Sequence, residues 1–234
     1  MKVLIVHAHY EPKSFNTALK DKALEVLRAG GHEVQVSDLH AMGWNPVASV
    51  NDFAAPQNPD YCTYALEQRK GFESSTIAPD IQREIAKVEW CDLLILNFPM
   101  FWFSMPAILK GWIDRVFVSG KFYGGRRIYD RGGMAGKKAM LAFTLGGREH
   151  MFGPRAIHGE MAGILRPIQQ GALAYCGFTV LPPFIGYHVP YISPEARAQM
   201  LEEYAAHLGR LEAMTPLSFP SMDNYDDLLN PKAG

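Results

Sequence analysis

Short runs of branched apolar residues alternate with helical patterns along this chain, and the alternation begins at its first residues. Residues 2–7 form a continuous apolar run typical of a strand buried on both faces. Apolar residues then recur at helical spacing from Phe15 until Gly30-Gly31, and residues 33–38 form a second strand pattern. A strand, a helix and a strand in this order form a βαβ unit, whose strands are parallel because the helix crosses back over the sheet. The chain is therefore restricted to an α/β architecture.

The same alternation returns in the rest of the chain. Further strands are predicted at residues 92–98, 137–145 and 179–185, and Pro182-Pro183 should bend the last of them. Helices are predicted at residues 106–118, 160–175 and 193–214, and Pro167 must kink or divide the second of these. We therefore predict a doubly wound α/β fold: a five-stranded parallel sheet of order 2-1-3-4-5 with helices on both faces.

Two stretches lie outside this alternation. Residues 42–78 are longer than an ordinary crossover loop and contain too many aromatic residues for a disordered linker. Residues 214–234 form a tail rich in Pro and Asp with scattered apolar residues. Either stretch can pack on its own domain or on a partner subunit. We predict one domain over residues 1–213, with 42–78 as a long excursion, followed by a C-terminal arm over 214–234.

The charge balance and the cysteines exclude several classes of protein. Lys and Arg number 23 against 24 Asp and Glu, whereas a sequence-independent nucleic-acid binder needs a basic surplus to neutralise phosphates. The cysteines are widely spaced, without a CxxC motif, and form neither a disulfide framework nor a zinc site: Cys62, Cys91 and Cys176. The N-terminal apolar run is too short for a signal peptide, and polar residues and prolines interrupt the apolar stretch 93–112. We therefore expect a cytoplasmic protein with no nucleic-acid partner and no membrane insertion.

In such a sheet, ligands bind beyond the carboxyl ends of the strands where the strand order reverses, so the loops after the first, third and fourth strands should meet there. The first loop runs from His9 into a helix that begins near Ser14, and free backbone N–H groups at a helix start favour an anion. A helix start of this kind is also ordinary capping. Neither GxxxxGK[ST] nor GxGxxG is present, which counts against an NTPase and against the usual dinucleotide fingerprint.

The other two loops suit a planar ligand. Residues 99–103 are mostly apolar and include three aromatic side chains, which can face a flat ring system or fill the core under a loop. The paired Gly146-Gly147 allows a close approach of backbone to a ligand, and it is also an ordinary turn sequence. His158 can supply positive charge near a ring site or cap a helix. We expect the remaining histidines to be surface or capping residues, among them His32, His40 and His207.

Several motifs are specific when they are taken together. They are HAHYEPKSFN at 7–16, FP-x-x-WF-S-MPAILKGW-x-DRVF at 98–117, T-x-GG at 144–147, IHGEM at 157–161 and CGF at 176–178. The chain therefore resembles the NAD(P)H:quinone acceptor oxidoreductase (DT-diaphorase-like) family. This resemblance implies a flavodoxin-like fold, a homodimer, and FAD held without a covalent bond, with FMN less favoured. It also implies an enzyme in which NAD(P)H as co-substrate and a quinone or similar planar acceptor take turns on the flavin, a two-electron ping-pong reduction.

The resemblance also implies roles for individual residues. The cofactor-binding residues would be His9, Ser14, Phe15 and Asn16 at the pyrophosphate; Pro99, Met100, Phe101, Trp102 and Phe103 along one ring edge; Thr144, Leu145, Gly146 and Gly147 along the other; and Phe152 and Arg197. The substrate-binding residues would be Trp102, Phe103, His158, Tyr123 and Tyr175, of which the two tyrosines reach the pocket from the second subunit.

The chain departs from the family pattern at the implied catalytic residue. His158 matches the histidine that stabilises the charge of the reduced flavin, whereas Phe152 stands where the animal members have a tyrosine linked to it. The missing hydroxyl predicts altered or slower chemistry. Gln170 and Ala174 occupy the positions at which one animal paralogue has metal-binding histidines, so we predict no metal site.

Two alternatives belong to other functional classes. Some relatives of this fold resemble cytoplasmic regulatory flavoproteins that bind potassium-efflux transporters, and the aromatic excursion 42–78 could serve such a contact. A one-electron flavodoxin shuttle is disfavoured, since those proteins are usually shorter and acidic and have a phosphate loop rich in Thr and Gly.

Overall fold

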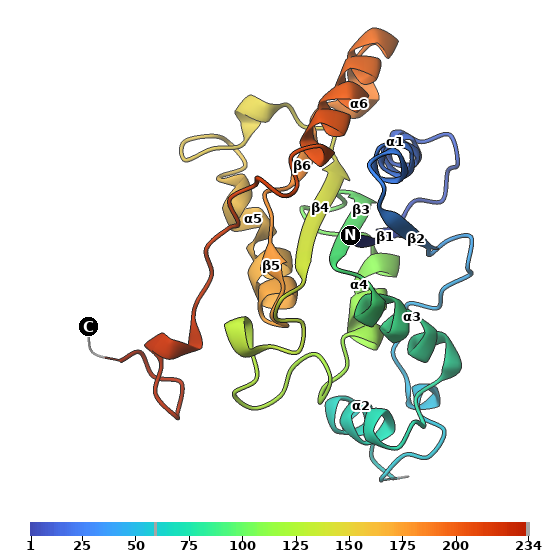
Figure 1. Cartoon of the computed structure of the whole chain (residues 1–234), viewed down its shortest axis with the longest axis vertical. Helices are drawn as coiled ribbons and strands as arrows, with labels where there is room; N and C mark the ends of the chain where they lie inside the picture. Colours follow the sequence, from blue (N-terminus) through green and yellow to red (C-terminus); the bar gives the residue numbers. More distant parts are fainter. Residues whose placement is uncertain (59, 233–234) are drawn as a thin grey trace.

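The centre of the protein is a twisted parallel sheet, seen in a computed structural model that describes residues 1–58 and 60–232 (Figure 1). Within the described residues the sheet has six strands: β1 (Lys2–His7), β2 (Glu33–Asp38), β3 (Leu93–Pro99), β4 (Lys138–Thr144), β5 (Thr179–Val180) and β6 (Phe184–Gly186). Their order is β2-β1-β3-β4-β5, with β6 also paired to β4, and all pairs are parallel. The predicted α/β class and strand order are confirmed.

The last predicted strand is divided rather than bent. β5 pairs Thr179 with Lys138, and β6 resumes beside the same neighbour where Phe184 faces Ala142. Pro182 and Pro183 lie between the two segments and have no N–H to donate to β4, so the ladder is interrupted there. The prediction of one strand over 179–185 is therefore corrected to two short strands.

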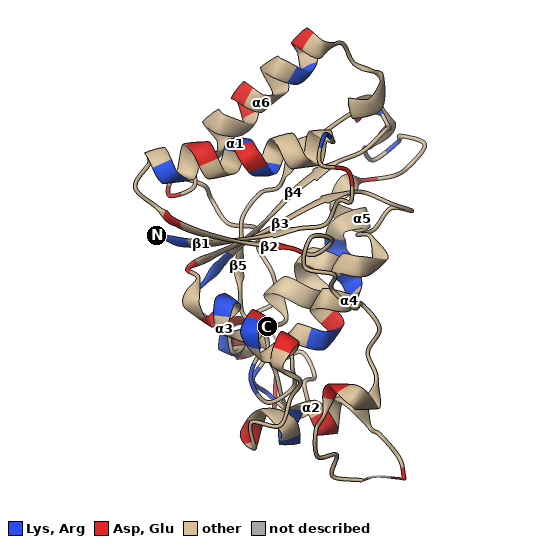
Figure 2. Ribbon diagram, turned by 90° about the vertical axis from the view of Figure 1, so that its right-hand side faces the viewer, with Lys and Arg blue, Asp and Glu red and all other residues tan. Residues whose placement is uncertain are grey.

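Helices cover both faces of the sheet (Figure 2). One face carries α1 (Phe15–Ala29) and α6 (Pro194–Leu208), and the other carries α3 (Pro79–Trp90), α4 (Ala107–Val116) and α5 (Met161–Ile168). Alternate residues of β1 enter the two cores: Val3 and Ile5 pack with α1 and α6, and Leu4 and Val6 with the other helices. None of the described helices is long and apolar enough to cross a membrane.

Two helix predictions need correction. The last helix ends at Leu208, with Gly209 at its C-cap, and does not continue to residue 214. Around Pro167 the chain stays helical but changes type, since α5 is followed directly by a π-helical stretch at Gln169–Ala174. Helix α3 is an element that the sequence analysis above does not include.

The excursion 42–78 packs on its own chain throughout its described part, which excludes residue 59. It contains helix α2 (Tyr64–Glu73), and Phe53 forms an antiparallel bridge with Ile77. Trp44, Phe53 and Ile77 are buried in the core beneath the sheet. The excursion therefore contributes to the core of its own chain, although Tyr61 at 72% exposure faces solvent.

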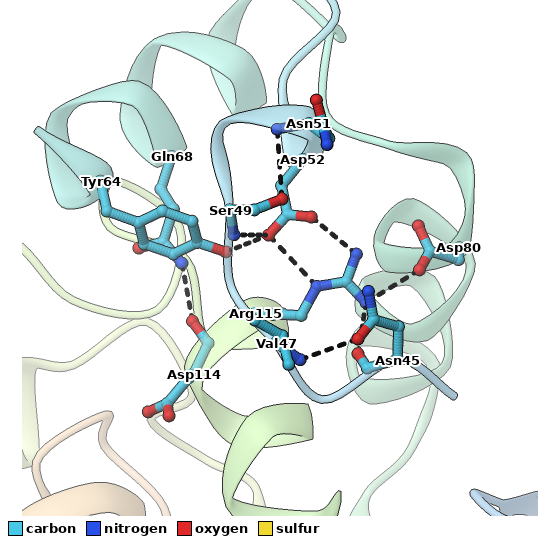
Figure 3. Close-up of polar contacts among 10 residues, drawn as sticks. All are labelled: Asn45, Val47, Ser49, Asn51, Asp52, Tyr64, Gln68, Asp80, Asp114 and Arg115. Carbon is cyan, nitrogen blue, oxygen red and sulfur yellow. Dashed lines mark hydrogen bonds and ion pairs between the residues drawn. The ribbon is translucent and has the colours of Figure 1, made fainter. Parts of the chain in front are cut away.

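A buried ion pair fastens this excursion to α4 (Figure 3). Arg115 donates from Nε and Nη2 to Asp52 at 3.1 and 2.8 Å, and from Nη1 to Asp80 at 2.9 Å. The hydroxyl of Tyr64 donates to Asp52 at 2.5 Å, and the guanidinium lies over the ring of Trp44. Burial alone would raise the pKa of Asp52, but the hydrogen bonds from Arg115 and Tyr64 hold it below its usual value. We call these residues the Arg115 cluster.

The C-terminal arm follows the β5 edge of the molecule (Figure 1). Leu217 donates its backbone N–H to Val180, and Met222 is buried and donates to Asp130 at 2.9 Å. Residues 233–234 of the predicted arm 214–234 lie outside the described part of the chain. The division into a domain and an arm stays a prediction.

Candidate active site

A cavity of about 390 Å³ opens at the carboxyl ends of β1, β3 and β4, where strand order reverses. Three loops form it, as expected from the parallel sheet. The residues that line it are His9, Lys13, Ser14, Phe15, Asn16, Pro99, Met100, Phe101, Thr144, Leu145, Gly146, Val189, Pro190 and Arg197. Eleven of the predicted cofactor-binding residues are therefore brought together in one place.

The helix start at Ser14 forms one wall of this cavity. Ser14 is the N-cap of α1, and its hydroxyl oxygen accepts the N–H of Thr17 at 3.1 Å. The first backbone N–H groups of a helix have no partner within the helix, so they make this end of the cavity attractive to an anion. Lys13 adds a positive charge beside it. We call this wall the anion end.

His9 presents a defined tautomer to the anion end. Its Nδ1 accepts the backbone N–H of Glu11 at 3.0 Å, so the proton of the neutral ring is on Nε2. Burial, and then the nearby His40, lower the pKa of His9, which favours this neutral form. A neutral His9 can therefore donate one hydrogen bond from Nε2.

Asn16 carries an unused polar atom on the cavity wall. Its Nδ2 donates to the Thr144 hydroxyl at 2.8 Å, while its buried Oδ1 has no hydrogen-bond partner among the described residues. A buried polar atom without a partner costs stability, so this atom fits a ligand that supplies the missing partner. Rotating the amide by half a turn lets Thr144 donate to Oδ1 and offers Nδ2 to an acceptor on the ligand.

The aromatic loop after β3 holds two strained residues at the rim of the cavity. Phe101 and Ser104 exchange two backbone hydrogen bonds of 2.9 Å, which leaves Trp102 and Phe103 as a two-residue turn. Both have positive φ, 51° and 57°, a conformation that favours Gly or Asn. Trp102 is 97% exposed. Strained backbone with exposed aromatic rings is typical of a binding site rather than of a packed core.

His158 lies on the same rim. Its ring is 5.2 Å from the ring of Phe103 and 5.2 Å from that of Phe152, and it is exposed. Gly147 permits this arrangement, because a Cβ there would stand 3.0 Å from the ring of Phe152. The loops after β3 and β4 therefore present an imidazole beside a flat aromatic surface.

Not all of the predicted residues line the cavity. Trp102, Phe103, Gly147 and Phe152 are outside its lining. Tyr123 and Tyr175 lie 5.6 Å apart, ring to ring, beside a second cavity of about 720 Å³ between α2, α4 and the π-helical stretch. The single chain thus keeps the two tyrosines apart from the loops that form the first cavity.

The structure adds lining residues that the sequence analysis missed: Lys13, Val189 and Pro190. Lys13 directly precedes the N-cap, a position that a search for anion sites could have included. The other two follow β6, which the sequence analysis did not separate from β5. The loop after β6 is held to the β4 loop, since Val189 donates to Leu145 at 3.2 Å, and Arg197 of α6 in turn donates to Val189.

Residues 1–208 match the family described as Flavodoxin-like fold. The chain belongs to this flavodoxin-like family. It is 43% identical to the NAD(P)H dehydrogenase (quinone) 1 of Cavia porcellus over 234 residues, which cover 100% of this chain and 84% of that protein. A solved structure from Klebsiella pneumoniae, assigned as a quinone reductase, has a TM-score of 0.92 and 40% identity over 96% of this chain and 91% of its own.

A further relative matches over a shorter region. The glutathione-regulated potassium-efflux system ancillary protein KefF of an Enterobacter species is 36% identical over 120 residues, 51% of this chain and 64% of that protein. The resemblance to the quinone oxidoreductases inferred from the sequence motifs is confirmed, since those relatives match across nearly the whole chain.

Proposed function

We propose that this protein is an FAD-dependent reductase that transfers two electrons from NAD(P)H to quinones or similar planar acceptors by a ping-pong mechanism. The observation that carries the proposal is a cavity with an anion end at α1 that lies beside the exposed aromatic turn at Trp102 and Phe103. A dinucleotide flavin has a diphosphate and a planar ring, and the cavity offers a surface for each. Its quinone-dehydrogenase relatives support the same reaction.

The residues present fit this cofactor. The Nε2–H of His9, the helix start at Ser14 and the charge of Lys13 would hold the diphosphate. The amide of Asn16 would gain the partner that it lacks within the described chain. Residues 99–101 and 144–146 would flank the ring, and Arg197 would lie near the adenine half. When bound, the flavin accepts two electrons and a proton from NAD(P)H and passes them to the second substrate.

The protein itself supplies orientation and charge. Trp102 and Phe103 offer the flat surface against which nicotinamide and acceptor would lie in turn. His158 would donate a hydrogen bond to negative charge that develops beside that surface, and a bond of this kind to a charged group contributes about 1.5–3 kcal/mol. Because His158 is exposed on the rim, it can reach a bound ligand and exchange its proton with water.

The two tyrosines suggest that a complete site needs two copies of the chain. Tyr123 and Tyr175 line a cavity separate from the anion end, and burial raises the pKa of both hydroxyl groups. In a homodimer this half-buried aromatic pair would face the active site of the partner.

Absorbance spectroscopy and steady-state kinetics test the proposal. The purified protein should be yellow, should release FAD on denaturation, and should lose its flavin absorbance on addition of NADH or NADPH without oxygen. Initial rates at several concentrations of NAD(P)H and menadione should give the parallel double-reciprocal lines of a ping-pong reaction. A protein that binds no flavin at micromolar concentration, or whose flavin NAD(P)H does not reduce, would falsify the proposal.

The role of His158 is tested by the change His158→Gln. The rate of flavin reduction should fall by about 100-fold, a typical loss when a proton-donating side chain is removed. His150→Gln is the matched control, since His150 is exposed on the same loop and, among the described residues, lacks the ring contacts that His158 makes with Phe103 and Phe152. Equal rates for the two variants would remove His158 from the catalytic residues.

The transporter-partner alternative is not favoured. The potassium-efflux ancillary protein matches about half of this chain, whereas the quinone dehydrogenase matches all of it. Residues 42–78, considered above as a contact surface for such a partner, bury their core aromatics on their own domain.

A further inference from the structure

A histidine is buried directly behind the anion end. His7 is the last residue of β1, is 1% exposed, and lies between Asp38 of β2 and Asn97 of β3 in the sheet register. The sequence analysis placed such histidines on the surface or at caps, which is wrong for His7. Its ring instead links the sheet to the first turn of α1 through Thr17.

Asn97 fixes which ring nitrogen of His7 can titrate. The Nδ2 of Asn97 donates to the Ala142 carbonyl at 3.3 Å, so its Oδ1 faces His7 Nδ1 at 2.6 Å. An amide oxygen only accepts hydrogen bonds, so Nδ1 carries a proton in both charge states of the ring. The Nε2 atom is therefore the one that gains or loses a proton.

Nε2 faces the hydroxyl of Thr17, which is hydrogen-bonded to Ser14 in the wall of the cavity. Thr17 Oγ1 lies 3.3 Å from Nε2, 3.0 Å from the Glu11 carbonyl and 3.1 Å from Ser14 Oγ. A hydroxyl has one proton to donate. When His7 is neutral, Thr17 satisfies Nε2 by donating to it. When His7 is protonated, Nε2 donates to Thr17, and the hydroxyl proton turns to Glu11, which is part of the loop before the N-cap.

We infer that His7 is a positioning residue for the phosphate groups of the cofactor: its protonation reverses the hydrogen bond to Thr17 and adds positive charge behind the anion end, so that phosphate binding and protonation of His7 strengthen each other. This inference rests on the proposed FAD site. His7 contacts no ligand itself and acts through Thr17 and Ser14.

The groups around His7 have opposing effects on its pKa, so a bound ligand can change its charge state. Burial lowers its pKa most, Asn97 and Asp38 raise it, and Lys20 of α1 and His9 lower it. A diphosphate at the helix start brings negative charge to the side where Lys20 and His9 otherwise oppose protonation. Binding therefore raises the pKa of His7, and by reciprocity protonation of His7 tightens binding.

The test measures the affinity of the flavin-free protein for FAD by quenching of flavin fluorescence, from about pH 7.5 to about pH 5.5. Histidine titrates in this range and the FAD diphosphate does not. The wild-type Kd should fall by about fivefold, the lower end of ordinary coupling between two sites. Riboflavin lacks phosphate, so its affinity should stay constant with pH. His7→Gln should show a smaller change than the wild type across the range, with the remainder arising from His9.

His32→Gln is the matched control, because His32 contacts the N-terminal amine at the other end of α1 and should leave the pH dependence of FAD binding intact. Thr17→Val keeps the shape of the side chain, removes the hydroxyl, and should weaken the pH dependence. If His7→Gln does not fold, NMR titration of labelled histidines in the wild type replaces it, with the pKa of His7 expected to be higher in the FAD complex than in the free protein.

The outcomes separate the inference from the proposed function. An FAD affinity that does not change with pH, a pH dependence as large in His7→Gln as in the wild type, or a His7 pKa unmoved by FAD would overturn the positioning role and leave the reductase proposal standing. A wild-type protein that binds neither FAD nor riboflavin would remove the proposed function and this inference with it.

Discussion

Around Arg115 each guanidinium nitrogen meets a protein acceptor, whereas at the anion end the amide oxygen of Asn16 has no partner in the described chain. The Arg115 cluster is closed: Arg115 and Asp52 are buried, and the charges of Arg115, Asp52 and Asp80 are paired and hydrogen-bonded to each other. The anion end is open to the cavity. A helix start, a lysine and the imidazole of His9 face the cavity, and the imidazole of His7 lies behind them; burial favours the neutral form of both rings. Asn16 and the Arg115–Asp52 pair are both polar and buried, so burial alone does not identify a functional site. An unpaired polar atom alone does not either, since Trp44 of the Arg115 cluster has a buried N–H without a partner among the described residues. The cavity beside Asn16 distinguishes the anion end.

The closed cluster predicts the largest effect on stability. Arg115→Leu leaves Asp52, which is 3% exposed, without its counter-charge, and breaking a buried pair in this way costs about 3–5 kcal/mol. Urea denaturation at neutral pH measures the free energy of unfolding. Lys110→Ala is the control, since Lys110 and Asp114 form an exposed pair at 2.6 Å and its loss should cost about 0.5 kcal/mol or less. Equal losses for the two variants would mean that the cluster does not hold the excursion in place.

The pH dependence of stability should separate the two regions. Burial lowers the pKa of His7, His9 and His207, so the unfolded chain takes up protons near about pH 6.5 while the folded chain takes them up only at lower pH. The free energy of unfolding should therefore fall as the pH drops through 6.5 toward the folded pKa values. The Arg115 cluster acts in a second window, since the lowered pKa of Asp52 keeps its contribution until the pH falls below about 3.8.

Calorimetry of the flavin-free protein from neutral to acidic pH distinguishes these windows. Two successive decreases in Tm are expected, and His7→Gln should reduce the first while Arg115→Leu should reduce the second. Part of the second decrease should remain, because the pKa values of Asp130 and Asp226 are also lowered by hydrogen bonds. A single decrease confined to the carboxylate range would show that the buried histidines do not contribute.

The sheet could be predicted because its sequence signal is local, whereas the site could be predicted only in part. Apolar runs and helical spacing indicated the class, the order 2-1-3-4-5 is that of the flavodoxin-like type of doubly wound sheet, and Pro182 and Pro183 mark the break that divides the last strand. The pairing of His7 with Asn97 has no local signal, since Asn97 lies 90 residues away along the chain and only the parallel register brings the two together. Val189 and Pro190 follow β6, so predicting that they line the cavity requires recognising that the last strand is divided.

Helix α3 shows a different kind of miss. Ile81, Ile85 and Val88 recur at helical spacing and are buried, so the local signal is present. The helix begins directly after the aromatic excursion, and the two segments are hard to separate by composition. The positive φ angles at Trp102 and Phe103 have no sequence signal, because neither residue type favours that conformation.

The strained turn predicts a gain in stability with a loss of function. Trp102→Gly should raise the free energy of unfolding by about 1 kcal/mol, because glycine adopts a φ of 51° without strain. The KM for the quinone should rise at the same time, since an exposed aromatic surface is removed. Tyr61→Gly is the control: Tyr61 is 72% exposed and is absent from the positive-φ residues, so the change should destabilise the protein slightly. A Trp102→Gly protein less stable than wild type would contradict the assignment of strain.

The smallest expected effect is at Phe152, whose ring lies 5.2 Å from His158 and 5.9 Å from Tyr187. Phe152→Tyr adds a hydroxyl beside the rim histidine, and because this site is partly exposed, water competes for the new hydrogen bond. We expect a gain of about 0.5 kcal/mol, or roughly a twofold faster flavin reduction in stopped-flow experiments. The same change in a His158→Gln background is the decisive comparison. If the hydroxyl acts through His158, the gain disappears there, and if the gain persists, the two rim residues act independently.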